Sequence, residues 1–85
     1  MQTDAPELPQ PDHTVDASGL KCPLPILRAK KALAGMESGQ ILRVITTDPH
    51  AGADFDAFCK QTGNPLLAQH QTNHADHLEH FLQRR

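Results

Sequence analysis

The chain of 85 residues lacks Trp and Tyr, and it contains only three Phe and two Cys. With so few rings, the core must be built from aliphatic side chains. The aromatic platforms on which single-stranded nucleic acids stack are also missing. The two cysteines, one expected to be exposed and the other buried, do not make a disulfide framework. The sequence therefore predicts one small domain with reduced thiols.

Long apolar runs and a strong net charge are missing as well. No apolar run approaches the ~18 residues that span a membrane, and the N-terminus has neither the basic nor the apolar region of a signal peptide. A formal net charge of −2 and a pI near 6.3 give no general attraction to nucleic acid or anionic membranes. We therefore expect a cytoplasmic protein without direct nucleic-acid or membrane partners.

Residues 1–12 differ in composition from the remainder of the chain. They carry three acids, three prolines and no Lys or Arg. Such a segment has little apolar surface to bury, so we expect a disordered, extended tail. The folded domain is predicted to comprise residues 13–85.

The residues of this domain alternate between strand and helix patterns. The patterns predict strands over 13–17, 40–47, 66–72 and 78–83, and helices over 23–36 and 54–61. A helix over 75–82 remains an alternative for the last strand, because its apolar residues also fit a helical spacing. The favoured β-α-β-α-β-β order predicts an α/β fold, a two-layer sandwich with both helices on one face of a mixed four-stranded sheet.

Cys22 directly precedes two prolines, Pro23 and Pro25, which suit the first turn of a helix. A thiolate at this position is stabilised by the unpaired N–H groups and the positive end of the helix dipole. Half of the eight Lys and Arg residues lie nearby in sequence, namely Lys21, Arg28, Lys30 and Lys31. We therefore expect a lowered thiol pKa and interpret Cys22 as a nucleophile. The alternative is a small apolar cap residue.

The first helix is expected to present two faces. Helical spacing places a core stripe on one side, formed by Ile26, Ala29, Leu33 and Met36. The residues off this stripe form a candidate docking patch beside the thiol, which comprises Leu24, Leu27, Arg28 and Lys31. Partial burial of the two leucines is an equally open reading, as is a merely solvated role for the two cations.

Two acids and the second cysteine are assigned to the second helix. Asp48 and Asp54 are expected at its start, with Asp48 as N-cap and as a possible contact for partners near the Cys22 loop. Cys59 shares an apolar face with Phe55 and Phe58, which predicts a buried structural thiol. A resolving or secondary sulfur-accepting role is the alternative for Cys59.

Four histidines in the last third suggest metal binding at first sight. They are His70, His74, His77 and His80. No Cys or carboxylate completes a familiar ligand spacing around them. We therefore expect solvated turn and edge residues and no metal site.

The segment from Asp12 to Pro25 closely resembles the start of the TusA (SirA-like) sulfur-carrier proteins. Their hallmark is Cys-Pro-x-Pro preceded by Asp-x-x-Gly-x-x, and it is matched here by Asp16, Gly19, Cys22, Pro23 and Pro25. Lys21, immediately before the cysteine, is a further supporting residue. Downstream matches extend the resemblance over residues 12–85, at Asp54, Phe58, Cys59 and Gly63.

The resemblance implies the same sandwich fold and a persulfide-dependent sulfurtransferase. Cys22 would accept sulfane sulfur from a cysteine desulfurase or rhodanese-like donor and relay it to an acceptor protein, in tRNA thiolation or sulfur oxidation. The persulfide would be covalent, no cofactor would be needed, and a monomer would suffice. The alternative is a non-catalytic interaction or regulatory module of the same fold. RNA binding is suggested only by analogy of fold.

Overall fold

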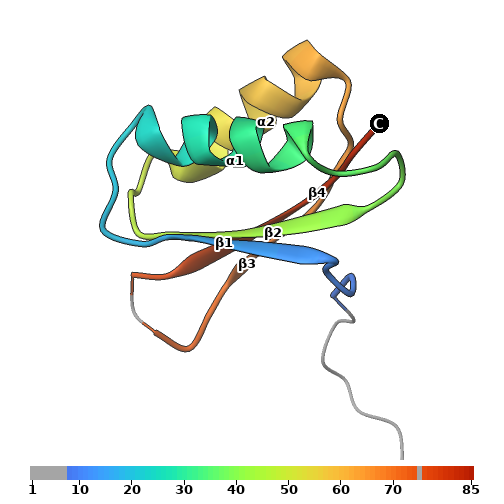
Figure 1. Ribbon diagram of the computed structural model, residues 1–85. Coiled ribbons are helices and arrows are strands. Elements are labelled where there is room, and N and C mark those ends of the chain that lie inside the picture. Colours follow the sequence, from blue (N-terminus) through green and yellow to red (C-terminus); the bar gives the residue numbers. More distant parts are fainter. Residues whose placement is uncertain (1–7, 75) are drawn as a thin grey trace, which may run out of the picture.

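The computed structural model describes residues 8–74 and 76–85. Its elements are β1 (His13–Ala17), α1 (Leu24–Ala34), β2 (Ile41–Thr46), α2 (Ala51–Thr62), β3 (Leu66–Gln71) and β4 (Leu78–Gln83). Both helices cover the same face of one sheet, and among the described residues no helix lies on the other face (Figure 1). The predicted order of elements and the two-layer architecture are confirmed.

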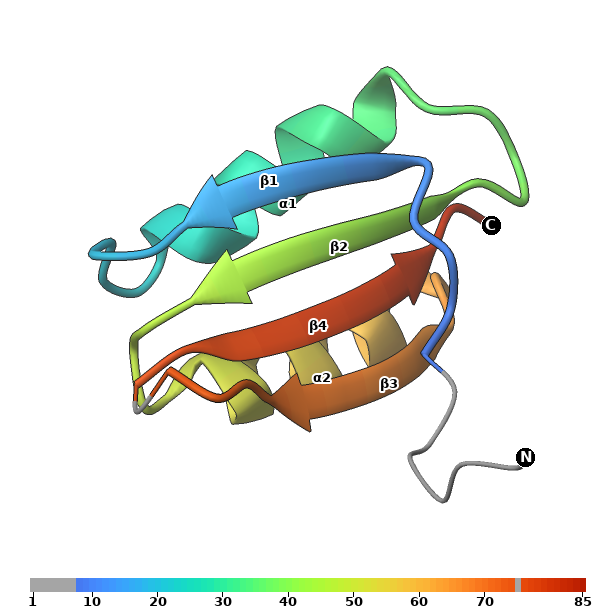
Figure 2. The same ribbon diagram turned by 90° about the horizontal axis from the view of Figure 1, so that it is seen from below.

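The sheet has the strand order β1-β2-β4-β3 and is mixed (Figure 2). β1 and β2 are parallel and are connected through α1, whereas β4 is antiparallel to both β2 and β3. Because β1 and β2 are parallel neighbours, their carboxyl ends lie at the same edge of the sheet. The loops that follow them, one of which contains Cys22, are thereby brought together.

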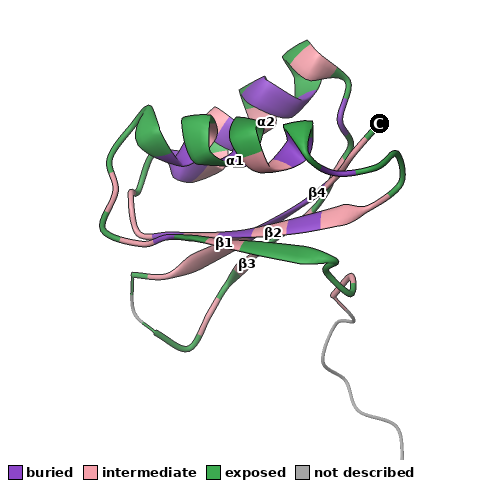
Figure 3. Cartoon of the chain, in the orientation of Figure 1, coloured by how far each residue is buried: buried purple, intermediate pink, exposed green. Residues whose placement is uncertain are grey.

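The core lies between the sheet and the two helices, where buried residues of both layers face each other (Figure 3). Alternate residues of β2 point into it, namely Leu42, Val44 and Thr46. Of the predicted helical stripe, Ala29, Leu33 and Met36 are buried and Ile26 is half-buried, so the core face of α1 is confirmed.

The ends of the helices differ from the expectation. α1 begins at Leu24, after Pro23 at the N-cap, and it ends at Ala34 because Gly35 forms the C-cap. α2 begins at Ala51 with His50 at the N-cap, so Asp48 is not the capping residue. Gly63 ends α2 in the left-handed conformation at φ 79°, as its position predicted.

The helical alternative for the last segment is wrong, because residues 78–83 form β4 between β2 and β3. The centre of this strand is buried, and the His80 ring lies against Phe55 of α2. No helix in the described part of the chain is long and apolar enough to cross a membrane.

His80 is fully buried, which corrects its assignment as a solvated residue. Its ring stacks on Phe55 with centroids 4.6 Å apart. Gln69 donates a hydrogen bond of 3.0 Å to Nδ1, so the Nε2–H of a neutral ring donates to the Thr46 hydroxyl at 2.7 Å. Burial lowers the pKa of His80 to about 4. The structure therefore holds an uncharged imidazole in its core.

The expected tail lies in large part outside the described residues, which begin at Leu8. Asp12, which was assigned to this tail, is joined to the start of β2. Its N–H donates to the Ile41 carbonyl at 2.7 Å, and its carboxylate accepts from the Ile41 N–H at 2.8 Å. The chain is therefore hydrogen-bonded to the start of β2 already at Asp12, one residue before β1.

Candidate functional site

Two loops at the carboxyl edge of β1 and β2 form the site. The β1–α1 loop covers residues 18–23 and the β2–α2 loop covers residues 47–50. The Thr47 hydroxyl accepts a hydrogen bond of 2.8 Å from the Gly19 N–H, and the Asp48 carboxylate accepts one of 2.9 Å from the Cys22 N–H. The second loop thus fixes the backbone of the cysteine loop at two points.

Asp16 and Gly19 of the family motif have backbone roles in the first loop. The Asp16 carboxylate accepts hydrogen bonds from the Ser18 hydroxyl at 2.6 Å and from the Ser18 N–H at 3.0 Å. These two bonds, the hydroxyl first, lower the pKa of Asp16. Gly19 has φ 79°, a conformation that residues with a Cβ rarely adopt. Both residues therefore shape the turn that presents the cysteine.

Cys22 lies exposed at the N-terminal end of α1, as predicted. Its peptide bond to Pro23 is cis. The turn is closed by the Leu24 N–H, which donates to the Lys21 carbonyl at 2.8 Å. Pro25 is buried and packs the first turn of α1 onto the domain. The two prolines of the motif thus hold an exposed thiol at a fixed place.

Asp48 links the two loops instead of lying on an open docking surface. Besides the Cys22 N–H, its carboxylate accepts the His50 N–H at 2.9 Å and faces the His50 ring at 3.3 Å. The backbone bond from His50 and then that from Cys22 lower the pKa of Asp48. Only 9% of its side chain is exposed. The structure therefore assigns Asp48 a positioning role.

The predicted lowering of the Cys22 pKa is wrong. The pKa of the thiol is raised, first by its hydrogen bond to the Asp54 carboxylate, then by desolvation and by the charges of Asp54 and Asp48. A carboxylate favours the uncharged thiol because it repels the thiolate. Sequence proximity was a poor guide here, because Asp54 is brought to the thiol by the fold.

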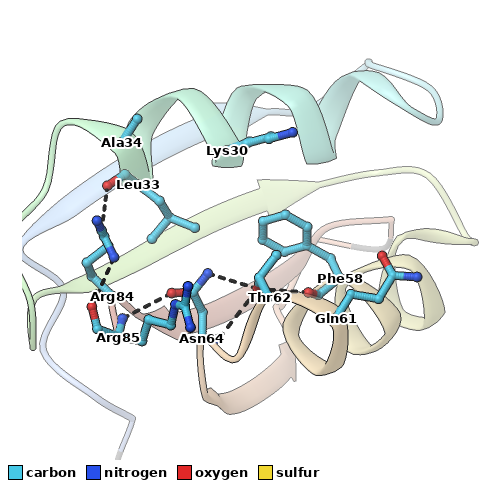
Figure 4. A pocket seen from close by; sticks show the side chains of 9 residues that line it. All are labelled: Lys30, Leu33, Ala34, Phe58, Gln61, Thr62, Asn64, Arg84 and Arg85. Carbon is cyan, nitrogen blue, oxygen red and sulfur yellow. Dashed lines mark hydrogen bonds between the residues drawn. The ribbon is translucent and has the colours of Figure 1, made fainter.

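The cations near Cys22 in sequence point in several directions in space. Arg28 and Lys31 line a hollow beside β1, on a side of α1 that Cys22 does not border. Lys30 lies above a cleft between α1 and α2, with Leu33 and Arg84 further along it (Figure 4). A helix spreads successive residues around its axis, so a run of cations in sequence does not surround a thiol at its end.

A pocket of about 440 Å³ opens between the two loops beside the thiol. Its walls include Leu20, Lys21, Thr47, Asp48, Pro49 and His50. Apolar and charged groups of both signs thus border Cys22. Cys22 is itself one of the residues that line this pocket.

The candidate docking patch is exposed, as expected for a patch off the core stripe. Leu24 is 46% exposed and Leu27 is 52% exposed. Arg28 and Lys31 are exposed on the same helix. Large apolar side chains at such exposure suit a surface that another protein covers.

Cys59 lies in the core and is not part of the site around Cys22. Cys59 is only 5% exposed, and desolvation, followed by the charge of Asp56, raises its pKa to about 11. The prediction of a buried thiol is confirmed.

His74 and His77 lie in the β3–β4 loop with ring centroids 5.0 Å apart. Within residues 8–74 and 76–85, no group of three or more His, Cys, Asp or Glu could hold a metal ion.

Thr47 was missed by the sequence analysis, and so was the contact between Asp54 and the thiol. Thr47 lies 28 positions from Gly19, and Asp48 lies 26 positions from Cys22. No local pattern signals such contacts. The parallel pairing of two predicted strands was the one available signal, since it brings their following loops together.

Comparisons with known families agree on one assignment. The family model described as "Sulfurtransferase TusA" matches residues 13–84. The sulfur carrier protein TusA of Allochromatium vinosum is 68% identical over 56 residues, which cover 66% of this chain and 74% of that protein. YrkI of Bacillus subtilis is 47% identical over 73 residues, which cover 86% of this chain and 95% of that protein.

The fold has a counterpart among solved structures. The crystal structure of a SirA-like protein from Desulfitobacterium hafniense superposes with a TM-score of 0.75 at 26% sequence identity. The superposition covers 84% of this chain and 95% of the other. Sequence and structure comparisons therefore point to the same family of sulfur-carrier domains.

Proposed function

The chain belongs to the TusA sulfurtransferase family, and we propose on this basis that it carries sulfane sulfur as a persulfide on Cys22 and relays it to an acceptor protein. One observation supports this most directly. Of the two thiols, Cys22 is exposed at the mouth of a pocket and held by two loops, whereas Cys59 is buried. Only Cys22 can reach a sulfur atom on another protein.

The proposed transfer is an exchange between thiol and persulfide. The Cys22 sulfur attacks the outer sulfur of a donor persulfide, a new S–S bond forms on Cys22, and the S–S bond of the donor breaks. The electron pair of the broken bond stays on the donor sulfur, which takes up the proton released by Cys22. The relay to an acceptor thiol repeats these events with Cys22 as leaving group. No net oxidation occurs, and the chemistry requires no metal or organic cofactor.

The proposal includes two classes of partner. The donor is a cysteine desulfurase or a rhodanese-like protein, and the acceptor carries a cysteine that serves tRNA thiolation or sulfur oxidation. Both are proposed to dock on the exposed residues of α1 that follow the thiol in sequence, namely Leu24, Leu27, Arg28 and Lys31. A monomer in the cytoplasm would present this surface to each partner in turn.

Mass spectrometry of sulfur loading tests the proposal. After incubation with a cysteine desulfurase and cysteine, or with a rhodanese and thiosulfate, the parent chain should gain ~32 Da per sulfur atom. Cys59→Ser should load like the parent, and Cys22→Ser should not load. Full loading of Cys22→Ser would refute the assignment of the site. Absence of loading in every variant would favour a non-catalytic interaction module.

A further inference from the structure

The β2–α2 loop, which fixes the cysteine loop, is itself bridged at its two ends by a chain of hydrogen bonds. Thr46 is the last residue of β2 before this loop, and Gly52 lies in the first turn of α2 after it. The Thr46 hydroxyl and Nε2 of His80 are 2.7 Å apart, and Nδ1 of the same ring is 3.0 Å from the side-chain nitrogen of Gln69. That nitrogen also donates to the Gly52 carbonyl at 2.9 Å. The bridge thus joins β2, β4, β3 and α2.

The donors and acceptors of this bridge match one another. The amide nitrogen of Gln69 carries two hydrogens, one for the Gly52 carbonyl and one for Nδ1 of His80. The neutral ring then carries its own hydrogen on Nε2 and donates it to the Thr46 hydroxyl. The ring is fully buried and stacks on Phe55 of α2 with centroids 4.6 Å apart. Because both ring nitrogens have partners and the ring is packed, the bridge has a fixed length.

The bridged loop also forms one wall of the pocket beside the thiol. Every residue of the β2–α2 loop, 47–50, lines this pocket together with the cysteine loop. The two loops meet through hydrogen bonds of 2.8 and 2.9 Å, which the Gly19 and Cys22 N–H groups donate to the β2–α2 loop. Thr47, the acceptor for Gly19, is the residue directly after the bridged end of β2. A change in the bridge is therefore passed to the bonds that place Cys22.

We infer that Gln69 and His80 are positioning residues of the Cys22 site, which hold the two ends of the β2–α2 loop at the separation that lets it bind the cysteine loop. Neither side chain needs to touch the thiol, because both act through the loop. The inference rests on the proposed sulfur-carrier function, since a defined place for Cys22 matters only if its sulfur reacts. A chain of hydrogen bonds whose members are all paired adds modest net stability but enforces a single geometry, which such a site requires.

Gln69→Met tests the positioning role, because it keeps the length of the side chain and removes both donors. Gln83→Met is the matched control. The Gln83 amide also donates to a backbone carbonyl, that of Gly39 at 3.1 Å, but it pairs beside the start of β2, whereas the site lies beyond the end of this strand. The first readout is hydrogen exchange of the Gly19 and Cys22 amides in the full chain, measured by NMR. The second is the rate of sulfur loading at Cys22 from a rhodanese and thiosulfate, measured by mass spectrometry.

We expect both amides to exchange several-fold faster in Gln69→Met than in the parent, because their acceptors in the β2–α2 loop are no longer held in place. Sulfur loading of Cys22 should slow several-fold, and Gln83→Met should match the parent in both measurements. Unchanged exchange in Gln69→Met, equal acceleration by both substitutions, or faster exchange with an unchanged rate of loading would overturn the inference. Exchange involves no partner and no sulfur, so a failed carrier function, seen as a parent that does not load, is distinguishable from a failed positioning role.

A second pair of variants keeps the test decisive if Gln69→Met does not fold. Thr46→Val removes the hydroxyl that accepts from the His80 ring, and Thr46→Ser retains it. Exchange of the Val44 and Leu82 amides, which belong to fully buried residues of the sheet, reports opening of the whole domain. Exchange at the site that accelerates relative to these core amides in Thr46→Val alone would support the inference. Equal exchange at the site in both Thr46 variants would overturn it.

Discussion

The two cysteines of this chain both have raised thiol pKa values, but for different physical reasons. Cys59 lies in the core, where desolvation raises its pKa to about 11. Cys22 lies on the surface, where the Asp54 carboxylate is the main cause. The pKa of a desolvated thiol changes only if the domain opens. The pKa of a thiol beside a carboxylate changes when another group neutralises that carboxylate. The two pKa values should therefore respond to different changes, that of Cys59 to opening of the core and that of Cys22 to the charge of its neighbours.

The two thiols are also positioned by different kinds of interaction. Cys22 depends on two loops joined by hydrogen bonds that the Gly19 and Cys22 N–H groups donate to Thr47 and Asp48. Cys59 depends on side-chain packing in a core that also contains Phe55 and the neutral His80. Changes of charge should therefore affect the site, and changes of packing should affect the stability of the domain.

The largest expected contrast is in alkylation rate. In the native protein at pH 8, Cys59 should react with iodoacetamide at least about 100-fold more slowly than Cys22, because only opened molecules expose it. In urea the two rates should become similar. Peptide mapping after timed quenching measures both sites in one sample. Comparable native rates would show that the core around Cys59 opens readily, and would remove the contrast.

The core should be sensitive to acid through His80. Its folded pKa of about 4 lies below the ordinary 6.5, so the unfolded state binds more protons between these values. The contribution of the neutral ring to stability is complete above about pH 6.5 and is lost as the pH falls toward 4. The loss amounts to up to about 3 kcal/mol.

Urea unfolding at several pH values measures this loss, with His80→Gln as the comparison. The substitution should lower stability at pH 7, because it removes the ring that stacks on Phe55. It should also flatten the dependence on pH between 6.5 and 4. Equal slopes for the variant and the parent would show that other groups cause the acid sensitivity.

Charge reversal on α1 should affect the site and leave the core unchanged. Arg28→Glu with Lys31→Glu should slow transfer between proteins about tenfold at low salt, because electrostatic steering acts on the association rate. Loading by a small persulfide should change little. The effect should diminish as salt is added, since exposed charges are screened.

Lys30→Glu with Lys60→Glu is the matched control for this reversal. It changes the net charge by the same amount, but Lys30 lines the cleft in Figure 4 and Lys60 lies on α2. We expect transfer rates near those of the parent. If both double variants slow transfer equally, the docking patch does not lie on the Leu24–Lys31 side of α1.

The sequence was sufficient to predict the fold because its periodic patterns agree with the tertiary structure. The β-branched segment that forms β2 predicted a central strand, and the three-and-four spacing of α1 predicted its buried face. The position of Cys22 before a proline-started helix was predictable for the same reason, since proline restricts where a helix can begin.

The electrostatics of the site were not predictable in this way. The Asp54 carboxylate is the largest cause of the raised pKa of Cys22 although it belongs to α2, and no local pattern signals this interaction. His80 was misassigned because a polar residue in a strand is expected to face solvent. Its partners Thr46 and Gln69 satisfy both ring nitrogens in the core, and they come from two other strands.

The smallest effect is expected at the N-terminal segment, which belongs to neither region. Deletion of residues 1–11 should leave the melting temperature within a few degrees of the full chain and the loading of Cys22 unchanged, because prolines and acids offer little to bury. Asp12→Ala is the informative comparison. It leaves the Ile41 N–H at the start of β2 without its carboxylate acceptor, so it should destabilise by about 1 kcal/mol. That loss corresponds to a decrease of about 4–8 °C in melting temperature. A larger decrease on deleting residues 1–11 than in Asp12→Ala would show that the segment packs on the domain.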